Sequence, residues 1–174
     1  MAASDAIRVR DAGPEDAALF AGFNAAMARE TEGKDLDESV LLRGSLGLFE
    51  QPQRGRYFLA ESAQEPFPAS HGETPAAQVL GGCLVTYEWS DWRAGTFWWL
   101  QSVYVLPQAR RRGVFRALYD HVLGLARATP GVVGLRLYVE RENERAQAVY
   151  RAVGMTESAY RLFEIDFVLG EPGA

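Results

Sequence analysis

Several residue types that support particular kinds of chemistry are scarce in this sequence. Cys83 is its only cysteine, so no disulfide can form within the chain, and we expect a reducing compartment. Lys34 is its only lysine, so its positive charge comes almost entirely from arginine. Its two histidines, His71 and His121, lie far apart, and neither is near a cluster of residues that bind metals. The sequence therefore predicts no disulfide framework, no metal site and no Ser-His-Asp arrangement.

Long apolar runs and an excess of positive charge are also missing. No segment approaches the ~18 apolar residues that span a bilayer, and residues 1–10 lack the apolar core of a signal peptide. The formal net charge of −5 argues against binding nucleic acid through bulk electrostatics. We therefore expect a soluble, cytoplasmic protein that binds neither membrane nor nucleic acid.

The length and the residue pattern predict one domain over residues 1–174. Residues 62–77 are rich in Pro, Ser, Gly and Glu and are expected to form a mobile surface loop, and residues 170–174 form a tail. The apolar periodicity predicts a mixed sheet with helices on its faces. The expected strands are 7–10, 56–61, 78–89, 96–106, 132–140 and 160–167, and the expected helices begin at Pro14, near Asp37, at Gly113 and at Asn143.

The most informative stretch is 103–116, where a strand ends at Pro107, three arginines follow at 110–112, and Gly113 opens a helix. The first turn of a helix has backbone N–H groups without acceptors and a partial positive charge, so a phosphate fits there. Glycine lets the backbone approach closely, and the arginines add charge. Alone, the arginine triplet is more typical of a solvated helix start. Neither a GxxxxGK run nor a GxGxxG run follows a strand in this chain.

A second pattern lies in the helix expected over 143–153. Asn143, Ala146 and Tyr150 are spaced three and four residues apart, so they share one face, and Gly154 ends the helix. Alone, Asn143 is explained as an N-cap and Tyr150 as an amphipathic core residue.

Together the two patterns, R-x-x-G-x-F at 110–115 and N-x-x-A-x-x-x-Y-x-x-x-G at 143–154, resemble the GNAT superfamily of N-acetyltransferases. The resemblance implies an α/β (α+β) fold with a mixed, mostly antiparallel central sheet flanked by helices, and strands that splay apart at the cofactor site. It implies transfer of an acetyl group from acetyl-coenzyme A to a primary amine of a small molecule or protein, by direct attack in a ternary complex. One departure is Phe115, which stands where the family has Gly or Ala, so we expect its side chain to point away, into the sheet.

The resemblance also assigns residues to coenzyme A and to the reaction. The main chain of Val103 and Val105 holds the pantetheine arm, N–H groups from 111 to 116 hold the pyrophosphate, and Asn143 binds the pantetheine. Tyr150, a phenol with an ordinary pKa of about 10, protonates the leaving thiolate. The full predicted set of cofactor-binding residues is Val103, Tyr104, Val105, Arg110, Arg111, Arg112, Gly113, Val114, Phe115, Arg116, Asn143, Ala146 and Tyr150.

The acceptor amine must lose a proton before it attacks, and the first candidates for the base are Glu30, at the end of the first helix, and Glu88, in the hairpin. Each is also explained as a solvated surface acid, and a water chain is a third route for the proton. Trp98 and Trp99 are neighbours on a strand and point to opposite faces, so one packs in the core while the other lines an acceptor pocket or a dimer contact. Acids beside aromatics favour a cationic amine acceptor, and the family often forms homodimers.

Other classes of function stay open. A non-catalytic sensor or regulatory module that binds acyl-coenzyme A would share the cofactor site but would have no use for Tyr150 as an acid. A structural or partner-binding domain, with the tryptophans as its interface, would have no affinity for coenzyme A. O-acylation, or an acyl group longer than acetyl, is also compatible with the sequence.

Overall fold

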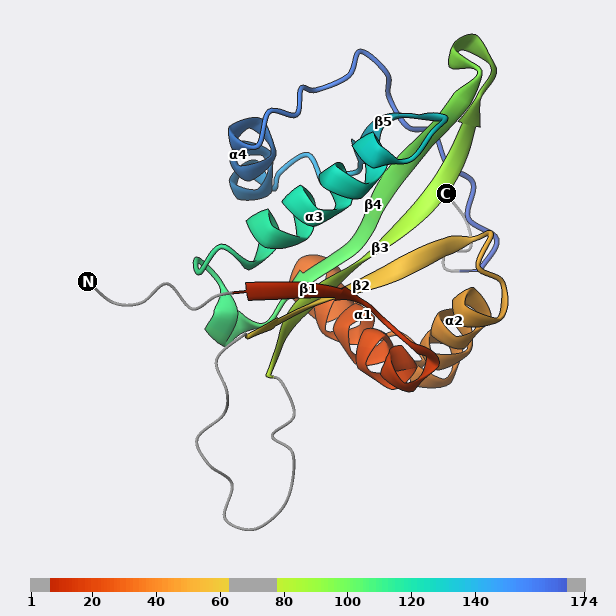
Figure 1. Ribbon diagram of the computed structural model, residues 1–174. Helices are drawn as coiled ribbons and strands as arrows, with labels where there is room; N and C mark the ends of the chain where they lie inside the picture. Colours follow the sequence, from red (N-terminus) through yellow and green to blue (C-terminus); the bar gives the residue numbers. More distant parts are fainter. Residues whose placement is uncertain (1–6, 63–77, 169–174) are drawn as a thin grey trace, which may run out of the picture. The chain divides into compact units, whose positions relative to one another are not determined.

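The computed structural model describes residues 7–62 and 78–168 and is shown in Figure 1. The predicted loop, from residue 63 onward and including His71, and the predicted tail lie outside the described residues. The chain divides into two compact units, Met1–Tyr138 and Val139–Ala174, which are described separately below. No helix in the described part is both long enough and apolar enough to cross a membrane.

The first unit is built on a five-stranded sheet. Its strands, in spatial as well as chain order, are β1 (Ile7–Asp11), β2 (Gly55–Ser62), β3 (Val79–Ser90), β4 (Gly95–Val105) and β5 (Val132–Leu137). β1 to β4 pair antiparallel, and β5 pairs parallel with β4. The mixed, mostly antiparallel sheet predicted from the sequence is therefore confirmed.

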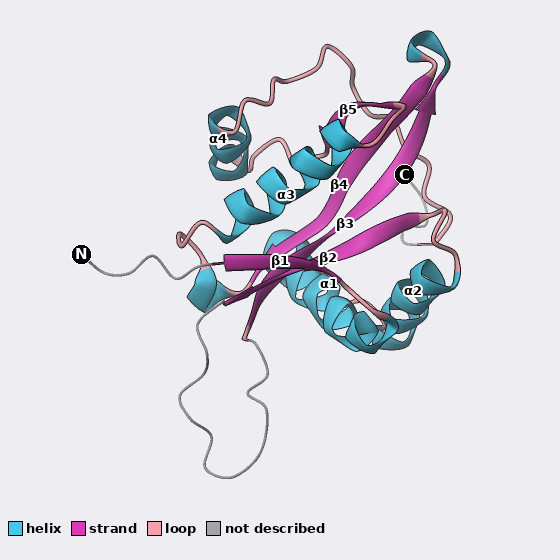
Figure 2. Ribbon diagram, viewed as in Figure 1, coloured by secondary structure: helices cyan, strands magenta, loops and turns pink. Residues whose placement is uncertain are grey.

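Three helices flank this sheet (Figure 2). α1 (Ala17–Glu32) and α2 (Glu38–Glu50) cover one face, and α3 (Val114–Ala128) covers the other. α2 begins as predicted, because the Asp37 side chain accepts hydrogen bonds from two first-turn N–H groups. α1 ends at Gly33, whose φ of 63° is left-handed and is easily adopted by glycine.

Alternate residues of β2 supply the core on both faces of the sheet. Tyr57 points toward the α1 face, where its ring stacks on Phe20 with centroids 4.0 Å apart. Phe58 points the other way and meets the His121 ring of α3 at 5.3 Å, so His121 is a packing residue. Both Phe20 and Phe58 are essentially inaccessible to solvent. A strand with apolar side chains on both faces fits a sheet covered on both sides.

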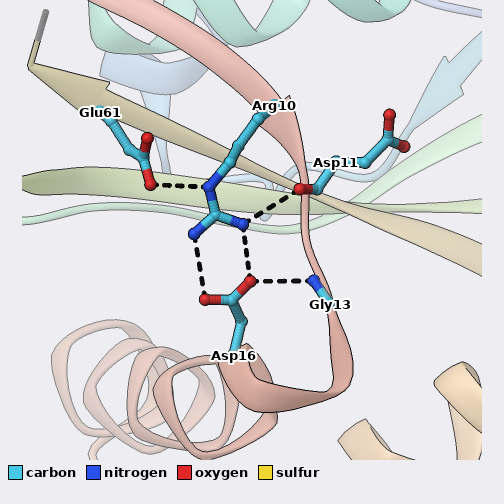
Figure 3. Close-up of polar contacts among 5 residues, drawn as sticks. All are labelled: Arg10, Asp11, Gly13, Asp16 and Glu61. Atoms are coloured by element: carbon cyan, nitrogen blue, oxygen red, sulfur yellow. Dashed lines mark hydrogen bonds and ion pairs between the residues drawn. The ribbon is translucent and has the colours of Figure 1, made fainter. Parts of the chain in front are cut away.

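A half-buried ionic cluster holds the start of α1 against the edge of the sheet (Figure 3). Arg10 on β1 donates from Nε to Glu61 of β2 at 2.7 Å and from both Nη atoms to Asp16 at 2.7 and 3.1 Å. The Gly13 N–H also donates to Asp16, at 2.9 Å. The guanidinium hydrogen bond, together with this N–H, lowers the pKa of Asp16. Asp16 is thereby kept as a carboxylate at the point where the chain turns from β1 into α1.

The second unit contains α4 (Glu144–Ala152), which ends at Gly154 with φ of 88°. This agrees with the helix predicted over 143–153. The strand predicted over 160–167 is wrong, because these residues form neither helix nor strand. Alternation of apolar and polar residues makes a segment competent to form a strand, but a strand also needs a neighbour that pairs with its backbone. Among the described residues, no strand pairs with this segment.

Candidate active site

β5 pairs with only the first half of β4 at the centre of the candidate site. The ladder between β4 and β5 runs from the pair Thr96–Val132 to the pair Leu100–Leu137. β4 continues to Val105, and over 101–105 it pairs with β3 alone among the described strands. Because β5 ends at the last pair of this ladder, the predicted splaying stays a prediction, and among the described strands none covers this open edge on the second half of β4.

A bulge lies at the start of this open edge. Gly82 pairs with Tyr104 and Leu84 with Gln101, so β4 has two residues, Ser102 and Val103, opposite one residue of β3. Ser102 has φ of 46°, a left-handed value that is uncommon for a residue with a side chain. A Cβ on Gly82 would lie 2.8 Å from the ring of Phe20, so glycine is needed for this close approach.

The turn that follows β4 exposes the N-terminus of α3. Arg111 and Gly113 both have left-handed φ values, 64° and 85°, and these reverse the chain into the helix. Gly113 is exposed, and among the described residues no heavy atom lies within 4 Å of a Cβ built on it. As a glycine it has no side chain with which to cap the first turn. The first-turn N–H groups are directed outward along the helix axis, where the macrodipole is positive. This geometry fits a phosphate or diphosphate group.

The four arginines around the turn, at 110, 111, 112 and 116, differ in their contacts and exposure. Arg110 points back along β4 and donates from Nε to the Val105 carbonyl at 3.0 Å. Arg116 pairs with Asp120 one turn along the helix, at 2.7 Å. Arg111 and Arg112 are exposed beside the helix N-terminus.

Phe115 lies along α3 itself. Its half-buried ring is 6.0 Å from the ring of Tyr119, one helical turn later, and the Tyr119 side chain is buried. Phe115 thus lies on the same side of α3 as the buried Tyr119, and its predicted orientation into the sheet stays a prediction.

Glu30, at the end of α1, is brought to the end of β4. Its carboxylate accepts a hydrogen bond from the Tyr104 hydroxyl at 2.6 Å and one from Arg110 Nη2 at 2.5 Å. The hydrogen bond from Tyr104, supported by Arg110, lowers the pKa of Glu30. Burial, with the neighbouring carboxylate, raises the pKa of the Tyr104 phenol. The Tyr104 side chain is buried against Phe23.

Glu88 lies farther up the β3–β4 hairpin and is also paired. Its two oxygens accept hydrogen bonds from Arg136 of β5 at 3.0 and 2.9 Å, and one also accepts the indole N–H of Trp99. The Arg136 guanidinium lies 3.7 Å from the centre of the Phe97 ring, a cation–π contact. Sequence reasoning missed Arg136, although its position opposite Trp99 on a neighbouring strand places it on the same face.

As predicted, Trp98 and Trp99 differ in burial, and Trp98 is the one buried in the core.

In the second unit, Asn143 caps α4. Its side-chain oxygen accepts the Ala146 N–H at 3.0 Å, which is the N-cap interaction expected from the sequence. Burial raises the pKa of the Tyr150 phenol, which is therefore protonated at neutral pH. The roles of Asn143, Ala146 and Tyr150 toward a cofactor remain predictions.

Comparison with known proteins identifies the family. The family described as "Acetyltransferase (GNAT) family" matches residues 30–155, so this chain belongs to that family. The chain is 35% identical over 95 residues to a thialysine N-epsilon-acetyltransferase of Caenorhabditis elegans, covering 55% of this chain and 56% of the relative. It is 48% identical over 61 residues to a mycothiol acetyltransferase of Beutenbergia cavernae, covering 33% of this chain and 20% of the relative. The chain therefore spans about half or less of the curated relatives that it matches.

Solved structures agree with this assignment. A possible acetyltransferase from Clostridium difficile 630 aligns with a TM-score of 0.79 and 37% identity, over 93% of this chain and 98% of that one. A predicted acetyltransferase with acetyl-CoA, from Clostridium acetobutylicum, aligns with a TM-score of 0.69 over 94% and 97%, and its 14% identity shows the fold alone. An aminoglycoside N-acetyltransferase in complex with CoA has 15% identity and a TM-score of 0.70, over 96% and 99%. Acetyl-coenzyme A is thus the cosubstrate of this family.

Proposed function

We propose that this protein transfers an acetyl group from acetyl-coenzyme A to a primary amine of a small molecule or protein, by direct attack in a ternary complex. Acetyl-coenzyme A supplies the acetyl group as a thioester, from which coenzyme A leaves as a thiolate. One observation carries most of the proposal: the open edge of β4 over 101–105 leads, through a short turn, into the exposed first turn of α3. An extended polar arm and a diphosphate thus have adjacent partners on one continuous stretch of chain.

Different groups of the chain bind the diphosphate and the pantetheine arm of the cofactor. The first-turn N–H groups of α3, with Arg111 and Arg112, hold the diphosphate. The N–H of Leu106 bonds to Leu80 of β3, so strand alternation turns the main chain of Val105 to the open edge. Since Arg110 already donates to the Val105 carbonyl, the Val105 N–H is the group on that residue that binds the pantetheine arm. Further along the same edge, the main-chain groups of Val103 also bind the pantetheine arm.

Proton transfers need an acid and a base. Tyr150 protonates the leaving thiolate, an assignment supported by its match to the family motif and by a phenol that stays protonated. The proton of the attacking ammonium is accepted by a carboxylate, for which Glu30 and Glu88 are the candidates, or by a water chain. Both carboxylates are in ion pairs, Glu30 with Arg110 and Glu88 with Arg136.

The acceptor is an amine, and we favour a cationic one. The names of the relatives, which include thialysine, mycothiol and aminoglycoside acetyltransferases, support an amine-bearing acceptor. Glu88 and the Trp99 ring suit an ammonium group, but Arg136 balances the charge of Glu88, so the aromatic ring carries more of this preference. If neutral amines outcompete polyamines and basic amino compounds in an acetylation screen, this preference is wrong.

Calorimetric titration with coenzyme A and acetyl-coenzyme A tests the cofactor site. We expect saturable binding by the wild-type protein and none by an Arg112→Glu/Gly113→Asp variant, which places two carboxylates at the helix N-terminus. A screen of amines then identifies the acceptor. Wild-type protein that binds neither form of the cofactor would contradict the proposal. The cytoplasmic location and the homodimer stay predictions, for cell fractionation and sedimentation to test.

A further inference from the structure

A polar bridge joins the end of α1 to the turn that precedes α3. Glu30 accepts hydrogen bonds from Tyr104 at 2.6 Å and from Arg110 at 2.5 Å, and these partners are 74 and 80 residues away in sequence. Arg110 also donates to the Val105 carbonyl at 3.0 Å. One carboxylate and one guanidinium thus connect three segments: a helix end, a strand end and the turn that leads to the proposed diphosphate site.

The guanidinium of Arg110 makes two directed contacts through different atoms. Nε faces the main chain of β4, and Nη2 faces α1. The guanidinium carbon also lies 5.6 Å from the centre of the Tyr104 ring, a cation–π contact at the edge of the usual range. The next residue before it, Ala109, is only 1% exposed. Arg110 is therefore held inward, and the chain turns outward only after it, at Arg111 and Gly113.

The surroundings of Glu30 suit holding a position better than accepting a proton. Both oxygens are bound by donors, and the hydrogen bond from Tyr104 lowers the pKa of this carboxyl, which weakens it as a base. The Tyr104 ring that supplies the first donor is buried in the core against Phe23, so this donor has little freedom to leave. The side chains of Arg110 and Glu30 are 36% and 39% exposed, so water can reach the pair, but the Val105 contact fixes one end.

From this geometry we infer that Glu30, Tyr104 and Arg110 are positioning residues, which fix the arginine turn and the first turn of α3 for the diphosphate of coenzyme A without touching it. The inference rests on the proposed function. It assigns to Glu30 a positioning role in place of the role of base, and to Arg110 a role in the turn in place of direct contact with phosphate. Arg111 and Arg112 keep the diphosphate contacts that the proposed function gives them.

Arg110 could either bind the diphosphate or position the turn, and the change in coenzyme A affinity caused by Glu30→Gln has a different sign in the two cases. If Arg110 bound the diphosphate, replacing Glu30 with neutral Gln would release it from a competing anion, and coenzyme A would bind as well or more tightly. If Arg110 positions the turn, Glu30→Gln removes its anchor, and binding weakens by about 10-fold, the usual scale for one charge-assisted hydrogen bond. Glu32→Gln is the matched control, because Glu32 lies at the same helix end in an exposed ion pair with Lys34, 2.9 Å apart.

The experiment measures the Kd of coenzyme A by calorimetry, and kcat and its pH profile at saturating acetyl-coenzyme A, for Glu30→Gln, Tyr104→Phe, Arg110→Met and the Glu30→Gln/Arg110→Met double variant. Thermal unfolding identifies any variant that fails to fold, and Tyr104→Phe, which keeps the buried ring, is the mildest of them. The inference predicts weaker binding for each single variant, no further loss in the double variant, and kcat within about 3-fold of wild type with the same pH profile.

Three results would overturn the inference. Additive losses in the double variant would mean that Arg110 and Glu30 act independently. A fall in kcat of about 100-fold with an altered pH profile and unchanged Kd would make Glu30 the base. Coenzyme A binding by Glu30→Gln that equals or exceeds wild type would place Arg110 on the ligand. Failure of the wild-type protein to bind coenzyme A is a separate result, which contradicts the proposed function itself.

Discussion

A single negative charge at Gly113 should weaken the binding of coenzyme A, and the position allows a closely matched control. Gly113 is exposed, and a Cβ there has no heavy atom of the described residues within 4 Å. Its φ of 85° is left-handed, a conformation that Asp and Asn tolerate better than other residues with side chains. Gly113→Asp and Gly113→Asn therefore have nearly the same shape and similar backbone strain, and they differ by one charge.

The size of the difference follows from the exposure of the site. Two unit charges 4 Å apart interact by about 1 kcal/mol in water and about 4 kcal/mol near a protein surface. Because Gly113 is exposed, we take about 2 kcal/mol, which makes coenzyme A bind about 30-fold more weakly to the Asp variant than to the Asn variant. Salt screens exposed charges, with a Debye length of about 10 Å at 0.1 M and about 3 Å at 1 M, so the ratio should fall as salt is added.

Titration calorimetry of both variants at low and high salt measures this ratio directly. Denaturant unfolding checks that the two variants have equal stability, each about 1 kcal/mol below wild type because of the left-handed backbone. Equal affinities of the Asp and Asn variants at low salt would refute the reasoning, because a diphosphate on the first turn of α3 cannot be indifferent to a carboxylate there.

Three further predictions concern the fold and the chemistry. Leu118→Ala, at a fully buried position of α3, should lower the free energy of unfolding by about 3–5 kcal/mol in denaturant titrations, and a loss below about 1 kcal/mol would contradict its place in the core. Because Arg10 lowers the pKa of Asp16, the carboxylate stabilises the fold above its ordinary pKa of about 4, and this stability is lost as pH falls through the lower pKa of the folded state. Asp16→Asn should therefore flatten the acid dependence of unfolding, and an unchanged slope would contradict the ion pair. Tyr150→Phe should lower kcat by about 100-fold with an unchanged Kd for acetyl-coenzyme A, and full turnover would remove Tyr150 as the acid.

Local signals in the sequence were sufficient to predict most of the helices and strands. Asp37 begins α2 through its side-chain hydrogen bonds, and Gly154 ends α4 with a left-handed backbone, as the residue types indicated. The apolar run before Pro107 and the glycine after the arginines placed β4 and α3 correctly. The segment 160–167 shows the limit of this reasoning, because its alternation does not specify a neighbouring strand to pair with.

The candidate site was predictable as a location but not as a set of contacts. The strand, the turn and the helix that hold the proposed cofactor are contiguous in sequence, so spacing revealed them. The bridge from Glu30 to Arg110 joins residues 80 apart, and the pair of Glu88 with Arg136 spans 48. Such pairs depend on strand register and on where a helix ends against a sheet, which one sequence does not specify. For that reason a surface acid and a paired acid could not be told apart for Glu30 and Glu88.

Acetyl transfer itself is the most direct test of the proposed function. Purified protein is incubated with acetyl-coenzyme A and a panel of amines, and the release of free thiol is followed together with the mass of each amine. We expect stoichiometric appearance of thiol and of an amine that has gained one acetyl group, both abolished in the Arg112→Glu/Gly113→Asp variant. Tight binding of acetyl-coenzyme A without acetylation of any amine or protein substrate would contradict the proposed function and would favour a sensor that binds acyl-coenzyme A.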